Sequence, residues 1–563
     1  MSYPLGDRIW HRFYDEGVPR EVSLYGICLP DLLKRSAEAF GSRTAAVFMG
    51  KVTTFSELFI SASRFASLLE SLGVKPRDRV ALLFLNVPAQ VICYYGALMA
   101  GAVVVQINPL GTEADMEHAL RQSEAKVIVA LDVLLGRFMK GLPLDRIEHV
   151  LVARLADDLP FWKRPALSLL SLVGKVELPP RRFGDDLGKL MSRARMPGQP
   201  VPISGDDLAL IQFTGGTTGI ARGAMLTHGN LAANVEQCRS WLRLGKEGKE
   251  VVLCVVPFFH VYGMTVAMNL SVRMAATMIL HHRFDVRAIL KSVQKHRPTQ
   301  FHGIQLFYGE IARHPDCRKY DLSSLRVCIS GAGPLMREVQ ERFESLTGAR
   351  VSEGYGLTEA SPVTHANPLY GTRKIGSIGI PIPSTDARIV DLETGDSDQP
   401  PGHAGELVVR GPQVMKGYWK GEDETKHALR NGWLYTGDIA VMDEDGFFRI
   451  VDRKKDLIKS GGENVYARDV EEVLFRHPAV LDAGVAGVPD EKWGEKVKAY
   501  VVLKEGRIAD GEELIRFCRE RLAGYQTPKE VEFRRELPRV PVVGKLLRRK
   551  LVEEEIEKRK GGR

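Results

Sequence analysis

Short apolar runs recur along most of the chain and alternate with stretches whose apolar residues follow helical spacing. The runs are AAVFM (45–49), VALLF (80–84), VVVQI (103–107), KVIVALD (126–132), ALIQF (209–213), VVLCVVPFF (251–259), ATMILH (276–281), TQFHG (299–303) and LRVCISG (325–331). Such runs are typical of strands buried on both faces, and their alternation with helices favours parallel pairing. The pattern therefore predicts a doubly wound α/β fold for the large N-terminal part of the chain.

The stretch 80–112 carries no charged residue, so it has to be compared with a membrane span. Breaker residues such as Pro88, Gly96 and Gly101 interrupt it. A spanning helix would not contain such punctuation, whereas a strand–helix–strand unit requires it. The sequence predicts a soluble, buried unit with a strand at 80–85, a helix at 89–100 and a strand at 102–107.

The pattern changes twice in the later part of the chain. Around 376–409, short strands separated by Gly and Pro turns indicate a small β-rich subdomain. The charged segment Asp452-Arg453-Lys454-Lys455-Asp456 then interrupts the apolar runs. After it, a small α+β domain is predicted, with a helix at 467–477, strands at 480–488 and 497–503, a helix at 512–523, a strand at 530–533 and a basic tail. We expect an N-terminal domain at 1–452, a hinge at 453–456 and a mobile C-terminal domain at 457–563.

Composition indicates which partners and which cellular compartment to expect for the protein. The 563 residues include 78 basic and 70 acidic residues, a modest excess, and no nucleic-acid recognition motif is present, so no nucleic-acid partner is expected. Seven cysteines are scattered without C-x-x-C spacing, which indicates reduced core residues of an intracellular protein. Charged residues interrupt the first apolar positions, which argues against a signal peptide, so we expect a cytoplasmic protein.

A glycine- and threonine-rich loop is the first candidate for chemistry. Residues 212–230 read QFTGGTTGIARGAMLTHGN, and the strand predicted at 208–213 comes directly before the loop. We expect the loop to run into a helix that starts near Thr227 or His228. Backbone N–H groups, hydroxyls and the cation of Arg222 can together surround an anion, although the Walker pattern is absent. Alone, the loop could equally be a surface turn.

Further motifs follow in a fixed order and decide between these readings. They are SGAGPL (330–335), EGYGLTE (353–359), NGWLYTGDIAVMDEDGFFRIVDRKKD (431–456) and PVVGKLLR (541–548). With these motifs the chain resembles the adenylate-forming (acyl-activating) enzymes from about residue 20 to 555. The segment 431–456 is most similar to the motif of medium- and long-chain fatty acyl-CoA synthetases. The family usually has Pro-Lys-Gly where this chain has Ala221-Arg222-Gly223, which keeps the cation and alters its shape.

The resemblance implies a reaction with ATP, Mg²⁺ and CoA. A fatty acid carboxylate attacks the α-phosphate of ATP, pyrophosphate leaves, and the thiol of CoA then displaces AMP. The residues implied for the β- and γ-phosphates are Thr214, Gly215, Gly216, Thr217, Thr218, Gly219 and Arg222. The metal ligands implied are Glu359 and the Thr214 hydroxyl, with Thr358 at the α-phosphate.

The resemblance also implies how the nucleoside is bound. Tyr355 is expected to stack on adenine. The residues expected around the base are Gly331, Ala332, Gly333, Pro334, Glu353, Gly354 and Gly356. Asp438 is expected to accept hydrogen bonds from the ribose hydroxyls, with Arg453 beside it, because one carboxylate can accept from both hydroxyls at once.

Lys545 is implied as the catalytic residue that stabilises charge while the α-phosphate is attacked; a solvated cation in a basic tail is the alternative interpretation. The loop before it is one residue longer than the common Pro-Thr-Gly-Lys form. The family rotates its small domain between the two half-reactions, with Lys455 at the expected pivot. The turn Ser460-Gly461-Gly462 is then expected to face the pantetheine of CoA.

Two features remain ambiguous from the sequence. His260 lies in PFFHVYG (257–263), and the pattern alone favours a satisfied core histidine. The resemblance implies instead that His260 positions the acyl carboxylate at the pocket wall. The segment 159–185 gathers Phe161, Trp162 and several leucines between basic residues. It is either a surface helix packed on its own domain or an interfacial segment that contacts the inner face of the membrane.

Three alternatives to the fatty acid–CoA ligase stay open. The protein could activate an aryl acid, or deliver acyl groups to a carrier protein, or bind nucleotide and fatty acid without turnover. Absence of a carrier-protein domain after the C-terminal domain disfavours an assembly-line module. A homodimer is also expected, and the acyl chain length cannot be read from the sequence.

Overall fold

A computed structural model describes residues 8–23, 26–139, 142–143, 145–165, 184–195, 201–214, 221–243, 245–490, 493–539 and 546–561. The chain divides into two compact units. The large unit comprises residues 10–386 and 410–434, and the small unit comprises residues 387–409 and 435–563 with the start of the chain. The expected hinge at 453–456 falls within the small unit, and its rotation stays a prediction.

A nine-stranded sheet forms one half of the large unit. Its central strands run parallel, and β2, β15 and β16 add antiparallel edges. In order across the sheet the strands are β16 (Ile380–Pro381), β15 (Val363–Ala366), β14 (Arg350–Gly356), β13 (Val327–Ser330), β12 (Gln300–Gly303), β10 (Val251–Cys254), β11 (Thr277–Leu280), β1 (Thr44–Phe48) and β2 (Lys51–Thr54).

An eight-stranded sheet forms the other half of the large unit. In order its strands are β19 (Gly417–Tyr418), β9 (Arg222–Thr227), β8 (Leu208–Thr214), β4 (Val103–Gln106), β3 (Arg79–Leu83), β5 (Val127–Leu131), β6 (His149–Ala153) and β7 (Asp185–Asp186). From β8 to β7 all neighbours are parallel, and β9 and β19 continue the sheet antiparallel. The predicted doubly wound α/β class is therefore confirmed, with mixed edges on both sheets.

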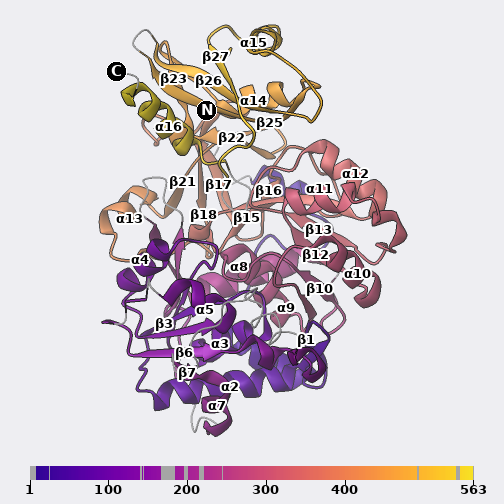
Figure 1. The fold of residues 1–563 in the computed structure, drawn as a ribbon, viewed down its shortest axis with the longest axis vertical. Helices are drawn as coiled ribbons and strands as arrows, with labels where there is room; N and C mark the ends of the chain where they lie inside the picture. Colours follow the sequence, from indigo (N-terminus) through magenta and orange to yellow (C-terminus); the bar gives the residue numbers. More distant parts are fainter. Residues whose placement is uncertain are drawn as a thin grey trace. The chain divides into compact units, whose positions relative to one another are not determined.

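Helices connect and cover these strands, as in α11, which packs on α10 and α12, and α12, which contacts β14 (Figure 1). Three of them, α2, α4 and α8, begin at threonine N-caps whose hydroxyls accept from the third helical N–H, so local sequence fixes where they start. The helices of the large unit are α1 (Leu29–Phe40), α2 (Phe55–Ser71), α3 (Pro88–Met99), α4 (Glu113–Ser123), α5 (Asp132–Phe138), α7 (Leu187–Arg193), α8 (His228–Leu242), α9 (Leu270–Arg273), α10 (Val286–His296), α11 (Gln305–Arg313), α12 (Arg337–Thr347) and α13 (Glu422–Ala428).

The uncharged stretch forms β3, α3 and β4, as predicted. Every residue of β4 is buried, and Tyr94 and Tyr95 of α3 are fully buried. Tyr95 donates to Asn269 at 2.8 Å, so its polar end is satisfied inside the core. Among the described helices none is both long and apolar enough to cross a bilayer. All seven cysteines are buried and free, which confirms their expected place in the core.

The loop of residues 212–230 differs from the expected strand–loop–helix order. Residues Arg222–Thr227 form the extra strand β9, which pairs antiparallel with β8, and only then does α8 begin at His228. Ala224 and Leu226 are fully buried on alternate positions of β9, which is a strand period that the glycine-rich composition concealed. Residues 215–220, which connect β8 to β9 in the sequence, lie outside the described residues.

The small unit contains two sheets. The first consists mainly of β17 (Asp386–Val390), β18 (Ala404–Arg410), β21 (Trp433–Met442) and β22 (Phe448–Arg453), and β20 (Leu429–Arg430) pairs with the first residues of β21. The second consists of β24 (Glu463–Val465), β23 (Ile458–Ser460), β26 (Gly494–Leu503), β25 (Val480–Asp490) and β27 (Glu530–Phe533).

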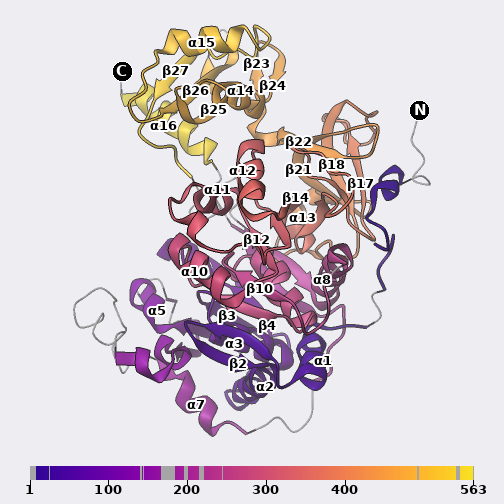
Figure 2. The same ribbon diagram turned by 90° about the vertical axis from the view of Figure 1, so that its right-hand side faces the viewer.

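Helices cover both faces of this second sheet (Figure 2). Val497, Ala499 and Val501 of β26 pack into one cluster with α14 (Ala467–Phe475) and α15 (Gly511–Arg519). The alternate residues Tyr500 and Val502 pack instead with Leu551 of α16 (Arg548–Gly561). This two-residue period places the helices on opposite faces. The predicted basic tail is thus a helix that completes the core.

The close packing of α2 on α3 depends on a glycine. A Cβ at Gly96 would lie 2.5 Å from the Ala62 carbonyl oxygen and 2.8 Å from Cδ1 of Phe65. We predict that Gly96→Ala lowers the unfolding free energy by about 1–3 kcal/mol, because the helices must move apart. Urea unfolding measures this. Gly333→Ala, where no atom lies within 4 Å of the added Cβ, is the matched control. Equal midpoints for both variants would contradict the tight contact.

Buried histidines give the fold a pH dependence. His302 of β12 is 2% exposed, and burial lowers its pKa to about 4. The unfolded chain, with a pKa near 6.5, binds the proton that the folded state excludes, so stability is lost as the pH falls from about 6.5 towards 4.

We predict that His302→Gln makes the loss of stability between pH 7.5 and pH 5 smaller by about 2 kcal/mol, because one titrating group is removed. Urea unfolding at the two pH values measures this difference. A His302→Gln variant with the same dependence as wild type would show that His302 takes up no proton on unfolding.

Candidate active site

The β8–β9 hairpin carries the anion-binding candidates at its tip. Thr214 ends β8 directly opposite Arg222, which begins β9, and the Thr214 hydroxyl donates to the Arg222 carbonyl at 3.4 Å. Gly215, Gly216, Thr217, Thr218 and Gly219 lie outside the described residues. The hairpin therefore brings the expected metal-binding hydroxyl and the expected phosphate-binding cation to the two ends of one loop.

Tyr418 connects Arg222 to Glu359. The Arg222 guanidinium lies 5.8 Å from the centre of the Tyr418 ring, and the Tyr418 hydroxyl donates to Oε1 of Glu359 at 2.8 Å. The Glu359 carbonyl in turn accepts from the backbone of Met415 at 2.8 Å. Tyr418 was not predicted, because nothing in a Gly-Tyr-Trp run places its phenol beside a carboxylate 59 residues earlier.

Glu359 fits the expected magnesium ligand. Its Oε1 accepts from Tyr418, and among the described residues no donor bonds its Oε2, which leaves an oxygen for a hard cation. The described residues contain no cluster of three or more His, Cys, Asp or Glu side chains that could hold a metal without help. Magnesium is commonly held by one or two carboxylates together with substrate phosphates.

The two predicted adenine motifs leave neighbouring strands at the same edge. β13 and β14 are parallel, with Ser330 opposite Glu353, so residues 331–334 and 354–356 emerge side by side. Ligands of α/β sheets bind outside the carboxyl ends of strands. Residues 331–334 follow the end of β13, and residues 354–356 are the last three of β14. Thr358 follows in the short helix η7 (Thr358–Ala360), next to Glu359.

The backbone of these motifs is closely packed. A Cβ at Gly331 would lie 2.9 Å from the Tyr262 ring, whereas Gly333 faces open space. Ala332 adopts a φ of 62°, a left-handed conformation. Tyr355 is half-buried and meets the His365 ring edge-on at 5.9 Å between centroids. The buried Glu353 accepts from the Asn367 backbone at 2.9 Å through its own carbonyl.

His260 lies in the turn that follows β10. Asn86 holds this turn, because its side chain accepts from Phe258 N at 2.8 Å and donates to the Val256 carbonyl at 2.9 Å. The Tyr262 backbone donates to Nδ1 of His260 at 3.2 Å. Burial lowers the pKa of His260 to about 4, so the ring is neutral at physiological pH. A neutral, anchored ring suits the expected positioning role, which stays a prediction.

In the small unit, Asp438 and Arg453 form the predicted pair. They face each other across β21 and β22, and Nε of Arg453 lies 3.0 Å from Oδ1 of Asp438. Asp438 is 4% exposed and its backbone donates to the Thr436 hydroxyl at 3.1 Å. A carboxylate fixed in this way keeps acceptor capacity for the hydroxyls of a ribose.

The remaining predicted residues of the small unit lie around the η8 helix (Lys454–Asp456) and the next hairpin. Lys455 is an exposed residue of η8. Ser460 is buried at the end of β23, and Gly461 and Gly462, with φ of 63° and 88°, form the turn to β24. A Cβ at Gly461 would lie 2.9 Å from the Trp493 ring. Lys545 lies outside the described residues.

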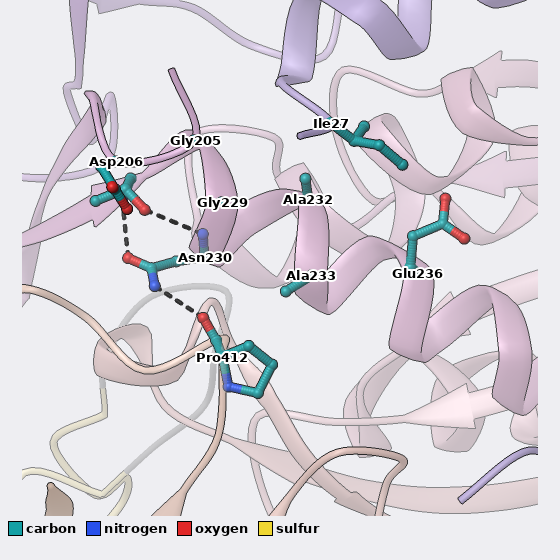
Figure 3. A pocket seen from close by; sticks show the side chains of 10 residues that line it. Ile27, Gly205, Asp206, Gly229, Asn230, Ala232, Ala233, Glu236 and Pro412 are labelled. Carbon is teal, nitrogen blue, oxygen red and sulfur yellow. Dashed lines mark hydrogen bonds between the residues drawn. The ribbon is translucent and has the colours of Figure 1, made fainter. Parts of the chain in front are cut away.

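A separate cavity of about 180 Å³ lies along α8 in the large unit (Figure 3). Its wall includes Asp206 and Glu236 and contains no Lys or Arg. Across it, Asn230 donates to the Pro412 carbonyl at 2.8 Å and Gly229 N donates to the Gly205 carbonyl at 2.7 Å. Two carboxylates and no cation make it a poor phosphate site, and none of its residues belongs to the predicted nucleotide set.

Known proteins resemble the chain over almost its whole length. The long-chain-fatty-acid–CoA ligase of Bacillus subtilis (strain 168) is 47% identical over 552 residues, which cover 97% of this chain and 98% of that protein. The long-chain-fatty-acid–CoA ligase of Escherichia coli O6:H1 is 38% identical over 554 residues, which cover 97% of this chain and 98% of that protein. ATP-bound MatB from Rhodopseudomonas palustris superposes with a TM-score of 0.82 at 29% identity, covering 94% of this chain and 99% of that chain.

Family models give the same result. The model described as AMP-binding enzyme matches residues 33–419, and the model of the AMP-binding enzyme C-terminal domain matches residues 469–542. The first match alone covers more than half of the chain and includes the hairpin, Arg222, Tyr418 and Glu359. The chain belongs to the AMP-binding enzyme family.

Proposed function

We propose that the protein is a fatty acid–CoA ligase that converts a fatty acid, ATP and CoA into acyl-CoA, AMP and pyrophosphate. Two relatives named long-chain-fatty-acid–CoA ligase, similar to this chain over nearly the full length of both proteins, support the substrate class. The structural observation that carries the proposal is the linked set Arg222, Tyr418 and Glu359 beside the glycine-rich hairpin. Arg222 offers a cation, and Oε2 of Glu359 accepts from no donor among the described residues, which supports binding of a polyphosphate with magnesium.

The first half-reaction brings two anions together. The acid carboxylate forms a bond to the α-phosphorus while the bond to pyrophosphate breaks, so negative charge must be neutralised by fixed groups. Bound Mg²⁺ would supply Lewis-acid screening of the phosphates, with Glu359 and the Thr214 hydroxyl as its protein ligands. Arg222 binds the outer phosphates bidentately, and Thr358 donates to the α-phosphate.

The remaining contacts orient the nucleoside and the acid. Tyr355 stacks on adenine beside residues 331–334, and Asp438 accepts from the ribose hydroxyls while Arg453 fixes its carboxylate. Neutral His260 orients the acyl carboxylate. Lys545 neutralises charge as the α-phosphate is attacked.

Before the second half-reaction, Lys545 must move out of the site so that CoA can enter. The CoA sulfur attacks the acyl carbon, the thiol proton is released, and AMP departs as the leaving group. Rotation at 453–456, with Lys455 as pivot, removes Lys545 and brings the Ser460–Gly462 turn to the pantetheine. Glycines suit this turn because a side chain would obstruct the thiol.

The homodimer expected from the sequence also stays a prediction.

We predict that purified protein with ATP, Mg²⁺ and palmitate releases AMP only when CoA is present, with an equal amount of acyl-CoA. Lys545→Ala should keep ATP binding and lose most of the adenylation, because the binding groups remain. Quantifying AMP and acyl-CoA by chromatography measures both. Acyl-adenylate formed without transfer to CoA would indicate that the acceptor is a carrier protein. Turnover with benzoate and not with palmitate would indicate an aryl acid substrate. Binding of ATP and palmitate without turnover would show that the protein is not a ligase.

We further propose that the protein contacts a membrane through residues near the start of the 159–185 segment. Phe161 and Trp162 are 76% and 62% exposed, and their rings meet edge-on at 5.1 Å. The β1–β2 turn lies beside them, because Lys163 Nζ donates to the Met49 carbonyl at 2.7 Å. Exposed Met49 and Val52 extend the apolar surface, and Lys163 places a positive charge at its edge. Such a surface suits anionic lipid. Residues 166–183 lie outside the described part of the chain.

We predict that Trp162→Glu lowers partitioning onto vesicles of phosphatidylglycerol and phosphatidylcholine about tenfold, because a large apolar side chain no longer enters the interface. Sedimentation with the vesicles measures the bound fraction. Ile508→Glu, at a 93% exposed position of the small unit, is the matched control. Unchanged partitioning of Trp162→Glu would refute the contact.

A further inference from the structure

The backbone of Tyr418 is fixed from two sides. β19 pairs with β9, so that the Trp419 N–H donates to the Gly223 carbonyl at 2.7 Å and the Lys416 N–H donates to the Met225 carbonyl at 3.0 Å. On the other side the Tyr418 N–H donates to the Thr425 hydroxyl at 2.8 Å. The phenol therefore projects from a two-residue strand that has little freedom to shift.

The phenol acts on one oxygen of Glu359. An ionised carboxylate can only accept hydrogen bonds, so Tyr418 is the donor in the 2.8 Å contact. Glu359 has three rotatable side-chain bonds and sits in the short helix η7, which by itself gives the carboxylate no fixed direction. A hydrogen bond to Oε1 selects one rotamer and leaves Oε2 without a donor from the described residues.

The ring of Tyr418 acts on Arg222. The guanidinium lies 5.8 Å from the ring centre, within the range of cation–π attraction. Arg222 begins β9, where the chain enters from the glycine-rich loop, and its side chain has several rotatable bonds. Contact with an aromatic face reduces that freedom, so that less entropy is lost when a phosphate binds.

We infer that Tyr418 is a positioning residue that acts through two neighbours: its hydroxyl orients the Glu359 carboxylate towards the metal, and its ring supports Arg222 towards the phosphates. This inference rests on the proposed function, because it requires that Glu359 meets a magnesium–nucleotide complex. Groups that hold a metal ligand from behind fix its direction and raise its affinity for the metal. Tyr418 differs from an ordinary structural tyrosine in contacting both partners of one site.

Two substitutions separate the two roles. Tyr418→Phe removes the hydroxyl, and with it the hydrogen bond to Glu359, and keeps the aromatic ring beside Arg222. Tyr418→Leu removes both. Tyr14→Phe is the matched control, because the Tyr14 hydroxyl also donates a hydrogen bond within the large unit, to the Pro381 carbonyl at 2.7 Å.

The measurement is nucleotide binding without a carboxylic acid, so that no turnover occurs. Calorimetry gives the Kd of ATP in EDTA and the Kd of ATP with Mn²⁺, and electron paramagnetic resonance counts bound Mn²⁺. We predict that Tyr418→Phe lowers the gain in affinity from Mn²⁺ about tenfold and leaves the Kd in EDTA unchanged. Tyr418→Leu is expected to weaken binding in EDTA as well, and Tyr14→Phe to change neither value. Urea unfolding of each variant shows that the fold is kept.

A double variant tests whether the hydroxyl acts through Glu359. If it does, Glu359→Gln alone and Glu359→Gln with Tyr418→Phe should show the same gain from Mn²⁺, because the two changes remove one interaction. The inference is overturned if Tyr418→Phe keeps the wild-type gain, or if the two losses simply add. Failure of the proposed function is a different result: wild-type protein would then show no gain from Mn²⁺ and no AMP release.

Discussion

Parallel pairing is the constraint on which the site depends. In a parallel sheet every strand ends at the same edge, so segments far apart in the sequence meet there without any direct attraction between them. β13 and β14 bring residues 331–334 beside residues 354–356 in this way. β10 brings the His260 turn to the end of the same sheet, where Asn86 of the other sheet's β3–α3 connection anchors it. The buried apolar strands thus have a functional consequence beyond stability.

The antiparallel edge of the eight-stranded sheet brings Arg222 and Tyr418 together. β9 turns back on β8 and places Arg222 opposite Thr214, and β19 then adds Tyr418 from a segment much later in the chain. A parallel neighbour would have required a crossover connection. The switch from parallel to antiparallel pairing therefore places Arg222 beside Tyr418, which in turn contacts Glu359.

The sequence predicted most of the elements because buried strands and amphipathic helices have strong periods. The β3–α3–β4 unit and β27 lie where the apolar pattern placed them, within a residue or two at each end. β9 was missed because Gly223 and the preceding glycines have weak strand propensity, and only pairing with β8 makes Arg222–Thr227 extended. The helix α16 was missed because its apolar positions are few, and Leu551 is informative only once the other face of β26 is known.

The site shows the same division between local and distant information. Motif resemblance named Arg222, Glu359 and Asp438, and the structure gives each of them a partner. Asp438 is held by Arg453 from the next strand, which the sequence had anticipated. Glu359 is held by Tyr418, which it had not. A motif records which groups meet the substrate, whereas the groups that hold them are chosen by the fold and can come from any strand that passes. Side chains that hydrogen-bond to a ligand-binding residue, without meeting the ligand themselves, are therefore the part of an active site that is identified only from the three-dimensional structure.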